Sequence, residues 1–222
     1  MTGFRYAEPN RHAYQYSLTI DRLLSSGLAT APAQEIIYRD GPRFSYREFA
    51  NRVSRLAAGL THAGATPGVT VSVLDWDSHR YLECYFAVPM LGAVLHTVNV
   101  RLSPEDILYT LKHAEAQILI VHPDFAEIID NIRGGLGDIK IIAIAPDGVD
   151  PASSDYEILI SECPSHSFEP VDEDAIATTF YTTGTTGLPK AVSFSHRQIV
   201  LHTLSTSIKL ASQAPLGMAI GD

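Results

Sequence analysis

Long apolar runs, clusters of basic residues and paired cysteines are all missing from this sequence of 222 residues. No uncharged apolar stretch approaches the roughly 18 residues of a membrane-spanning helix, and residues 1–10 are polar where a signal peptide has its apolar core. Cys84 and Cys163 are far apart and form no CxxC pair, which is typical of reduced thiols in the cytosol. The sequence therefore predicts a soluble, cytoplasmic protein.

Positive charge is also scarce. The chain has 16 Lys and Arg residues against 25 Asp and Glu residues, which gives a net charge of −9. An acidic chain without a basic run lacks the surface that binds a phosphate backbone, so we expect no nucleic-acid partner. One lysine with a few backbone amides can still bind a small anion. The nine histidines include no HExxH motif and no cysteine at ligand spacing, so we expect surface or capping residues instead of metal ligands.

Strand and helix patterns alternate through the first two thirds of the chain. Helical patterns start at Ser45, where Glu48 completes a capping box, and at Ser103, where Pro104 takes the first helical position. Two more helices are predicted at 78–90 and 123–132. The strand patterns cover residues 35–39, 69–74, 93–98, 117–121 and 140–145. This alternation predicts an α/β fold with a doubly wound, mostly parallel sheet that is flanked by helices.

A composition change divides the chain. Residues 146–170 contain four prolines around one short helical stretch, 156–162, and are predicted to connect two units. A strand at 175–182, a polar loop and a strand at 191–194 then form a hairpin, and a helix follows from Ser195. We therefore predict an N-terminal α/β subdomain at 1–170 and the opening of a second subdomain at 171–222.

The hairpin loop carries the chemistry. Residues 182–190 read TTGTTGLPK, so glycines permit a sharp turn, backbone amides can converge on an anion, and hydroxyls and one lysine add donors. This pattern favours a nucleotide phosphate site over a plain hairpin turn. The Walker loop does not fit, because Pro189 replaces its last glycine and Ala191 follows Lys190 where Ser or Thr is required.

Residues 181–192, YTTGTTGLPKAV, resemble the phosphate-loop motif of the adenylate-forming superfamily. Thr183 replaces a common serine and Ala191 a common glycine, and neither change removes a charge. Residues 18–24, 81–97 and 99–111 resemble medium- to long-chain fatty acyl-CoA synthetases, although Val100 replaces a frequent proline.

The resemblance implies a chain that is part of the N-terminal domain of the adenylate-forming fold. Such enzymes use ATP and Mg²⁺ to convert a carboxylate into an acyl-adenylate and pyrophosphate, and then transfer the acyl group to coenzyme A. By position, the β- and γ-phosphates would be bound by Thr182, Thr183, Gly184, Thr185, Thr186, Gly187 and Lys190. Thr182 would also help to ligate Mg²⁺. No residue of this chain is expected to act as nucleophile or general base.

The sequence ends at Asp222 without the adenine, ribose and hinge segments of the family. We therefore expect an N-terminal fragment of a fatty acid–CoA ligase that has little or no activity alone. Two alternatives stay open: a structural or nucleotide-binding module, and an adenylating enzyme for another carboxylate. The resemblance also implies a fatty acid substrate, peripheral membrane association at most, and a homodimer. Four aromatic residues could serve that dimer contact or pack on the chain's own core: Phe4, Tyr6, Tyr14 and Tyr16.

Overall fold

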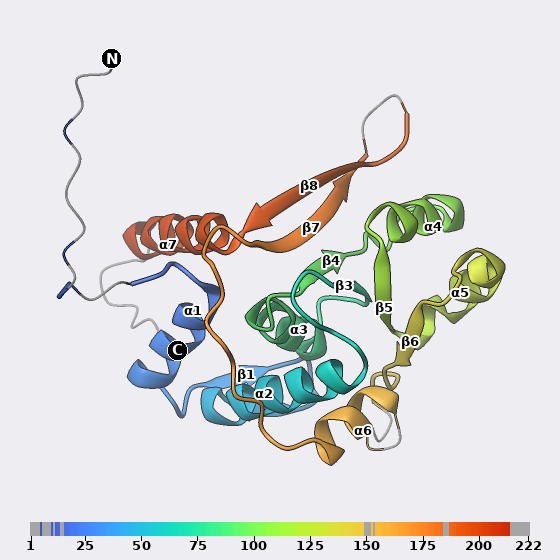
Figure 1. The fold of residues 1–222 in the computed structure, drawn as a ribbon. Helices are drawn as coiled ribbons and strands as arrows, with labels where there is room; N and C mark the ends of the chain where they lie inside the picture. The colour runs from blue at the N-terminus through green and yellow to red at the C-terminus, as the bar shows by residue number, and fades with distance from the viewer. Residues whose placement is uncertain are drawn as a thin grey trace.

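The computed structural model describes residues 16–148, 154–183 and 187–213, together with positions 5, 10, 12, 13 and 152. Its centre is a six-stranded sheet with the strand order β6-β5-β3-β4-β7-β8 (Figure 1). The first five strands of that order are parallel, and β8 is antiparallel to β7. Their bounds are β3 Thr70–Leu74, β4 Val94–Thr97, β5 Ala116–Val121, β6 Lys140–Ala143, β7 Ile176–Thr182 and β8 Lys190–Ser195.

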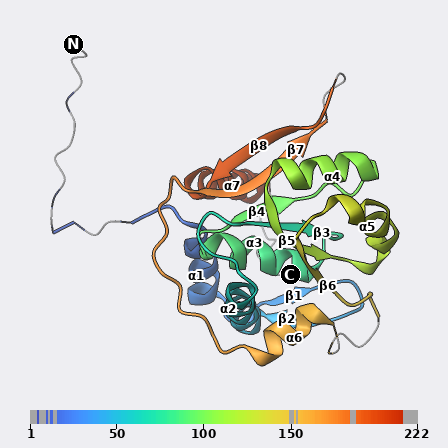
Figure 2. The same cartoon turned by 45° about the vertical axis from the view of Figure 1, so that its right-hand side comes forward.

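Helices cover both faces of this sheet (Figure 2). One face packs against α2 (Tyr46–His62), α3 (His79–Met90) and α6 (Asp155–Glu162), and the other against α4 (Pro104–His113) and α5 (Ala126–Ile132). Next to α3 lies α1 (Ile20–Thr30), which also contacts α7 (His196–Gln213). The predicted doubly wound, mostly parallel α/β fold is confirmed.

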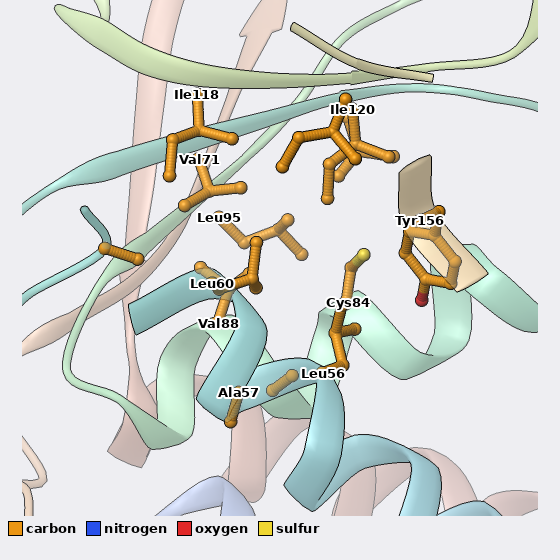
Figure 3. Packing of buried hydrophobic residues seen from close by; sticks show 14 of the residues in the cluster. Leu56, Ala57, Leu60, Val71, Cys84, Val88, Leu95, Ile118, Ile120 and Tyr156 are labelled. Carbon is orange, nitrogen blue, oxygen red and sulfur yellow. The ribbon is translucent and has the colours of Figure 1, made fainter. Parts of the chain in front are cut away.

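The parallel strands are apolar on both faces because both faces are covered. Val71 and Ile120 belong to the core that α2 and α3 close, whereas Leu74 and Leu119 belong to the core under α4 and α5. In the first core, Figure 3 shows Leu60 of α2 directed toward the strand residues. Alternate residues of one strand thus fill two separate cores.

Polar caps fix where the helices begin. The Ser45 hydroxyl accepts a hydrogen bond from the Glu48 amide, and the Glu48 carboxylate accepts one from the Ser45 amide, so the predicted capping box is present. The Ser103 hydroxyl caps α4 by accepting a hydrogen bond from the Asp106 amide, with Pro104 at the first position. Both predicted helix starts are confirmed, since each cap satisfies amides that the helix itself leaves free.

Several details differ from the sequence-based expectation. The short helix predicted at 156–162 is present as α6, but its segment is more than a connection, because Tyr156 is fully buried in the main core (Figure 3). The helix predicted at 123–132 is a 3₁₀ turn, Pro123–Phe125, followed by α5. The strand predicted at 35–39 is present as β1 (Glu35–Ile37), but it pairs with β2 (Arg43–Ser45) in a small, separate antiparallel sheet. Helix α1 and β2 were not predicted, and a three-residue strand such as β2 carries little pattern.

The expectation that the histidines lie at the surface or at caps is wrong for part of the set. Four of them are buried: His79, His96, His122 and His196. Burial lowers the pKa of His79 to about 3 and of His96 to about 4, so both imidazoles are neutral at physiological pH. Of these, His122 is also a cap, since its Nδ1 accepts from the Asp124 amide. No three His, Cys, Asp or Glu side chains of the described residues gather as a metal site.

The hairpin belongs to the same sheet as the preceding strands. β7 pairs in parallel with β4, with Leu95 opposite Thr178 and Thr97 opposite Phe180. The predicted unit 171–222 therefore starts with a strand of the central sheet, and the boundary at residue 170 stays a prediction. Within the described part of the chain, no helix has both the length and the apolarity to cross a bilayer.

Candidate phosphate site

The β7–β8 hairpin places two predicted site residues directly opposite each other. Thr182, the last residue of β7, pairs with Lys190, the first residue of β8, and residues 183–189 connect them. Since β7 is parallel to β3, β4, β5 and β6, this loop lies at the edge of the sheet where those strands end. Open α/β sheets bind their ligands at that edge. The hairpin extends away from the sheet beside α4 (Figure 1).

The described residues around the loop are open to solvent. Thr182, Thr183, Gly187 and Lys190 are all exposed. Among the ion pairs of the described residues, none involves Lys190, so its ammonium charge is available to a ligand. The other predicted residues, Gly184, Thr185 and Thr186, lie outside the described residues.

Gly187 explains one part of the loop sequence. Its φ of +106° lies in the region that side chains with a Cβ rarely adopt. An added Cβ would meet no atom of the described residues within 4 Å, so the backbone conformation is what requires glycine here. The open space also lets a ligand approach the backbone closely.

The hydroxyl of Thr182 lies at the base of the loop. Its Oγ1 is 3.5 Å from the Lys190 carbonyl oxygen, at the outer limit of a hydrogen bond. The hydroxyl is therefore only weakly engaged and can turn toward a ligand. One neutral oxygen fits Mg²⁺ as a single member of an octahedral set that phosphates and waters complete, which is how Mg²⁺ is commonly bound.

A polar cluster that sequence reasoning missed supports the base of the loop. Tyr181 is buried, and its hydroxyl lies 2.8 Å from Nδ1 of His113 on α4. Its ring also contacts that of His96, with centroids 5.2 Å apart. Burial, with a smaller contribution from Tyr109, raises the pKa of Tyr181 to about 12, so the phenol stays neutral. Nothing in the sequence pairs Tyr181 with His113, which is 68 residues away.

A second concavity competes with the loop as a candidate site. A cavity of about 650 Å³ lies between the β1–β2 turn, the start of α3 and residues 146–148, and includes no phosphate-loop residue. Each of its arginines already has a carboxylate partner: Arg39 lies 2.8 Å and Arg80 2.9 Å from Asp147, and Arg52 pairs with Glu83 and Glu157. Lys190 has no ion pair among the described residues and lies at the ligand-binding edge of the sheet, so the loop is the better anion site.

The described part of the chain thus combines a mostly parallel α/β sheet with an outer hairpin whose loop is flanked by Thr182 and Lys190. The chain belongs to the AMP-binding enzyme family, whose model matches residues 26–220. The predicted resemblance to the adenylate-forming superfamily is thus confirmed.

Similarity to individual proteins indicates which branch of this family the chain resembles. The chain is 41% identical over 168 residues to a long-chain-fatty-acid–CoA ligase of Thermus thermophilus, covering 75% of this chain and 30% of that protein. It is 36% identical over 173 residues to a medium-chain-fatty-acid–CoA ligase of Ectopseudomonas oleovorans, covering 75% and 32%. The crystal structure of the anthranilate CoA ligase AuaEII in complex with anthranoyl-AMP superimposes with a TM-score of 0.74 at 25% identity, covering 82% and 35%. The chain thus spans about a third of the length of these relatives.

Proposed function

We propose that this chain supplies the triphosphate-binding loop of an ATP-dependent fatty acid–CoA ligase. The observation that carries the proposal is the hairpin that sets the unpaired Lys190 opposite Thr182 at the ligand-binding edge of the sheet. The fatty acid substrate is supported by the names of the two bacterial relatives. The homodimer and the cytoplasmic location belong to the same proposal and rest on sequence reasoning.

In this function the chain's own residues bind and orient the nucleotide. Lys190 would neutralise charge on the β- and γ-phosphates, and Thr182, Thr183 and the loop amides would donate hydrogen bonds to them. Thr182 is also our candidate for one Mg²⁺ ligand. When bound, ATP supplies the adenylyl group that activates the carboxylate and the pyrophosphate that leaves, and coenzyme A accepts the acyl group. Because no loop residue is a nucleophile, the contribution is positioning and electrostatic stabilisation.

Binding of MgATP tests the loop directly. A ligand at 100 times its dissociation constant stabilises the folded state by about 2.7 kcal/mol, which a thermal-shift assay detects. Lys190→Ala removes a charged donor that contributes about 1.5–3 kcal/mol, so the dissociation constant should rise roughly 10- to 150-fold.

A matched control is available in the same sheet. Lys140 is also exposed and also begins a strand, but β6 starts at the opposite edge of the sheet. Lys140→Ala should therefore leave MgATP binding unchanged. Equal losses in both variants, or no thermal shift of the wild-type chain at millimolar MgATP, would favour the structural module that the sequence left open.

A different carboxylate substrate is the second candidate. The fold match to a ligase that holds anthranoyl-AMP indicates that this fold also serves aryl acids. ATP–pyrophosphate exchange, driven by short, medium or long fatty acids or by an aryl acid, separates the two candidates. We expect the fatty acids to support exchange in a longer protein that contains this chain, and little or no exchange by the chain alone.

A further inference from the structure

The base of the phosphate loop extends beyond the support of the central sheet. The register between β4 and β7 ends at Thr97 and Phe180, so Tyr181 and Thr182 pair only with β8. β8 is an edge strand, and its first two residues, Lys190 and Ala191, are exposed. The pairs Tyr181–Ala191 and Thr182–Lys190 carry the loop, and among the described residues no further strand flanks either side of them.

A side chain of α4 compensates for that missing support. The imidazole of His113 lies in the last turn of α4, within 2.8 Å of the Tyr181 hydroxyl, and the two rings meet edge to face. The helix itself is firmly held, because Ile107 and Leu111 are completely buried and Ser103 caps its start. Figures 1 and 2 both show β7 of the hairpin beside α4.

We infer that His113 is a positioning residue that fixes the phosphate loop through its hydrogen bond to Tyr181, an inference that rests on the proposed function. Tyr181 immediately precedes Thr182, and Thr182 is opposite Lys190, so a shift of the phenol would displace both phosphate-binding side chains. Packing alone would not need the hydroxyl, since phenylalanine fills the same space. The hydrogen bond of the Tyr181 hydroxyl to His113 additionally fixes the distance between the hairpin and α4.

The bond forms with either tautomer of His113. A phenol both donates and accepts, so it can donate to an Nδ1 without a proton or accept from an Nδ1–H group. Tyr181 itself keeps its proton because its pKa is raised to about 12. The contact therefore does not depend on which ring nitrogen carries the proton.

Two side-chain replacements test this support. Tyr181→Phe removes only the hydroxyl, whereas His113→Ala removes its hydrogen-bond partner together with the ring contacts to Tyr181 and Tyr109. Each should make the amides of Tyr181, Thr182, Lys190 and Ala191 exchange about two- to tenfold faster, the range for one hydrogen bond. Magnesium pyrophosphate, the probe for the loop, should bind the same two- to tenfold more weakly. In the His113→Ala background, Tyr181→Phe should cause little further loss, because the hydrogen bond is already absent.

Two controls separate this support from general destabilisation. Tyr109→Phe deletes a hydroxyl from the ring that packs on His113 but does not bond to Tyr181, and should behave as wild type. His113→Gln keeps a donor and an acceptor and should restore most of the affinity. The amides of Thr178 and Thr179, in the supported part of β7, should exchange at unchanged rates in every variant.

The outcomes also distinguish this inference from the proposed function. If the wild-type chain binds pyrophosphate and Tyr181→Phe and His113→Ala bind it equally well, the positioning role of His113 is refuted and the loop function stands. If the wild-type chain binds neither pyrophosphate nor MgATP, the proposed function is refuted, and this inference is refuted as well.

Discussion

Replacing Arg52 with methionine should destabilise the protein strongly, because Arg52 neutralises a fully buried carboxylate. Its guanidinium lies 2.6 Å from Glu83 and 2.7 Å from Glu157. Glu83 is completely buried and also accepts a hydrogen bond from the Tyr156 hydroxyl at 2.7 Å. Burial raises the pKa of Glu83, and Arg52 opposes this rise by pairing with the ionised form. Methionine fills similar space but leaves the carboxylate without its cation.

Breaking a buried pair from one side costs about 3–5 kcal/mol, and we expect a loss of that size for Arg52→Met near pH 7. Without Arg52, the pKa of Glu83 in the folded state rises further above its ordinary value of 4.5. The folded variant then binds more protons than the unfolded chain above pH 4.5, so its stability falls as the pH rises through that window. The loss relative to wild type should therefore shrink toward pH 4.5 and below.

Urea unfolding followed by circular dichroism at pH 7 and pH 4.5 measures both effects. Adding Glu83→Gln to Arg52→Met removes the buried charge and should recover a large part of the loss. Arg43→Met is the control, because Arg43 and its partner Glu35 are both exposed and such pairs contribute about 0–1 kcal/mol. A stability loss below about 1 kcal/mol at pH 7 would refute this reasoning, since about 3–5 kcal/mol is expected for a buried pair. A loss of the same size at pH 7 and at pH 4.5 would refute it as well.

Three further predictions concern the core, a cap and a buried imidazole. Leu56→Ala should cost about 2–5 kcal/mol in urea unfolding, because Leu56 is completely buried, whereas Leu82→Ala, at a position 36% exposed, should cost less than half as much. Ser45→Ala should cost about 0.5–2 kcal/mol by removing the α2 cap, and a neutral result would mean that the capping box is dispensable. The pKa of His79 falls from 6.5 to about 3, so the unfolded chain binds more protons and wild-type stability should fall as pH drops below 6.5. His79→Gln should flatten this dependence in unfolding measured from pH 7 to 4, and equal slopes would contradict the assignment.

Local signals in the sequence were sufficient for much of the fold. The capping residues Ser45 and Ser103 predicted the helix starts because a cap acts only on the next turn of chain. The apolar run at 93–98 predicted a strand covered on both faces, which is β4, and Thr182 and Lys190 were predicted to flank one loop. Each of these inferences depends on residues that are close in sequence.

The features that sequence reasoning missed depend on contacts between distant residues. Tyr156 appeared to lie in a connecting segment, but its hydroxyl bonds to Glu83, which is 73 residues away, and its ring fills the main core. His79 and His96 were expected at the surface or at helix caps, and only the packing of helices and strands around them made them neutral, buried groups.

The sequence by itself determined the alternation of strands and helices, the glycine-containing phosphate loop and the family, because these depend on spacing along the chain. Only the tertiary structure decided that β7 pairs with β4, which brings the loop to the ligand-binding edge of the sheet. It alone brought His113 to Tyr181 and left Lys190 without an ion pair among the described residues. Such contacts depend on strand order and helix placement. Both arise when elements that are distant in sequence pack together to form the two cores, so no local stretch encodes them.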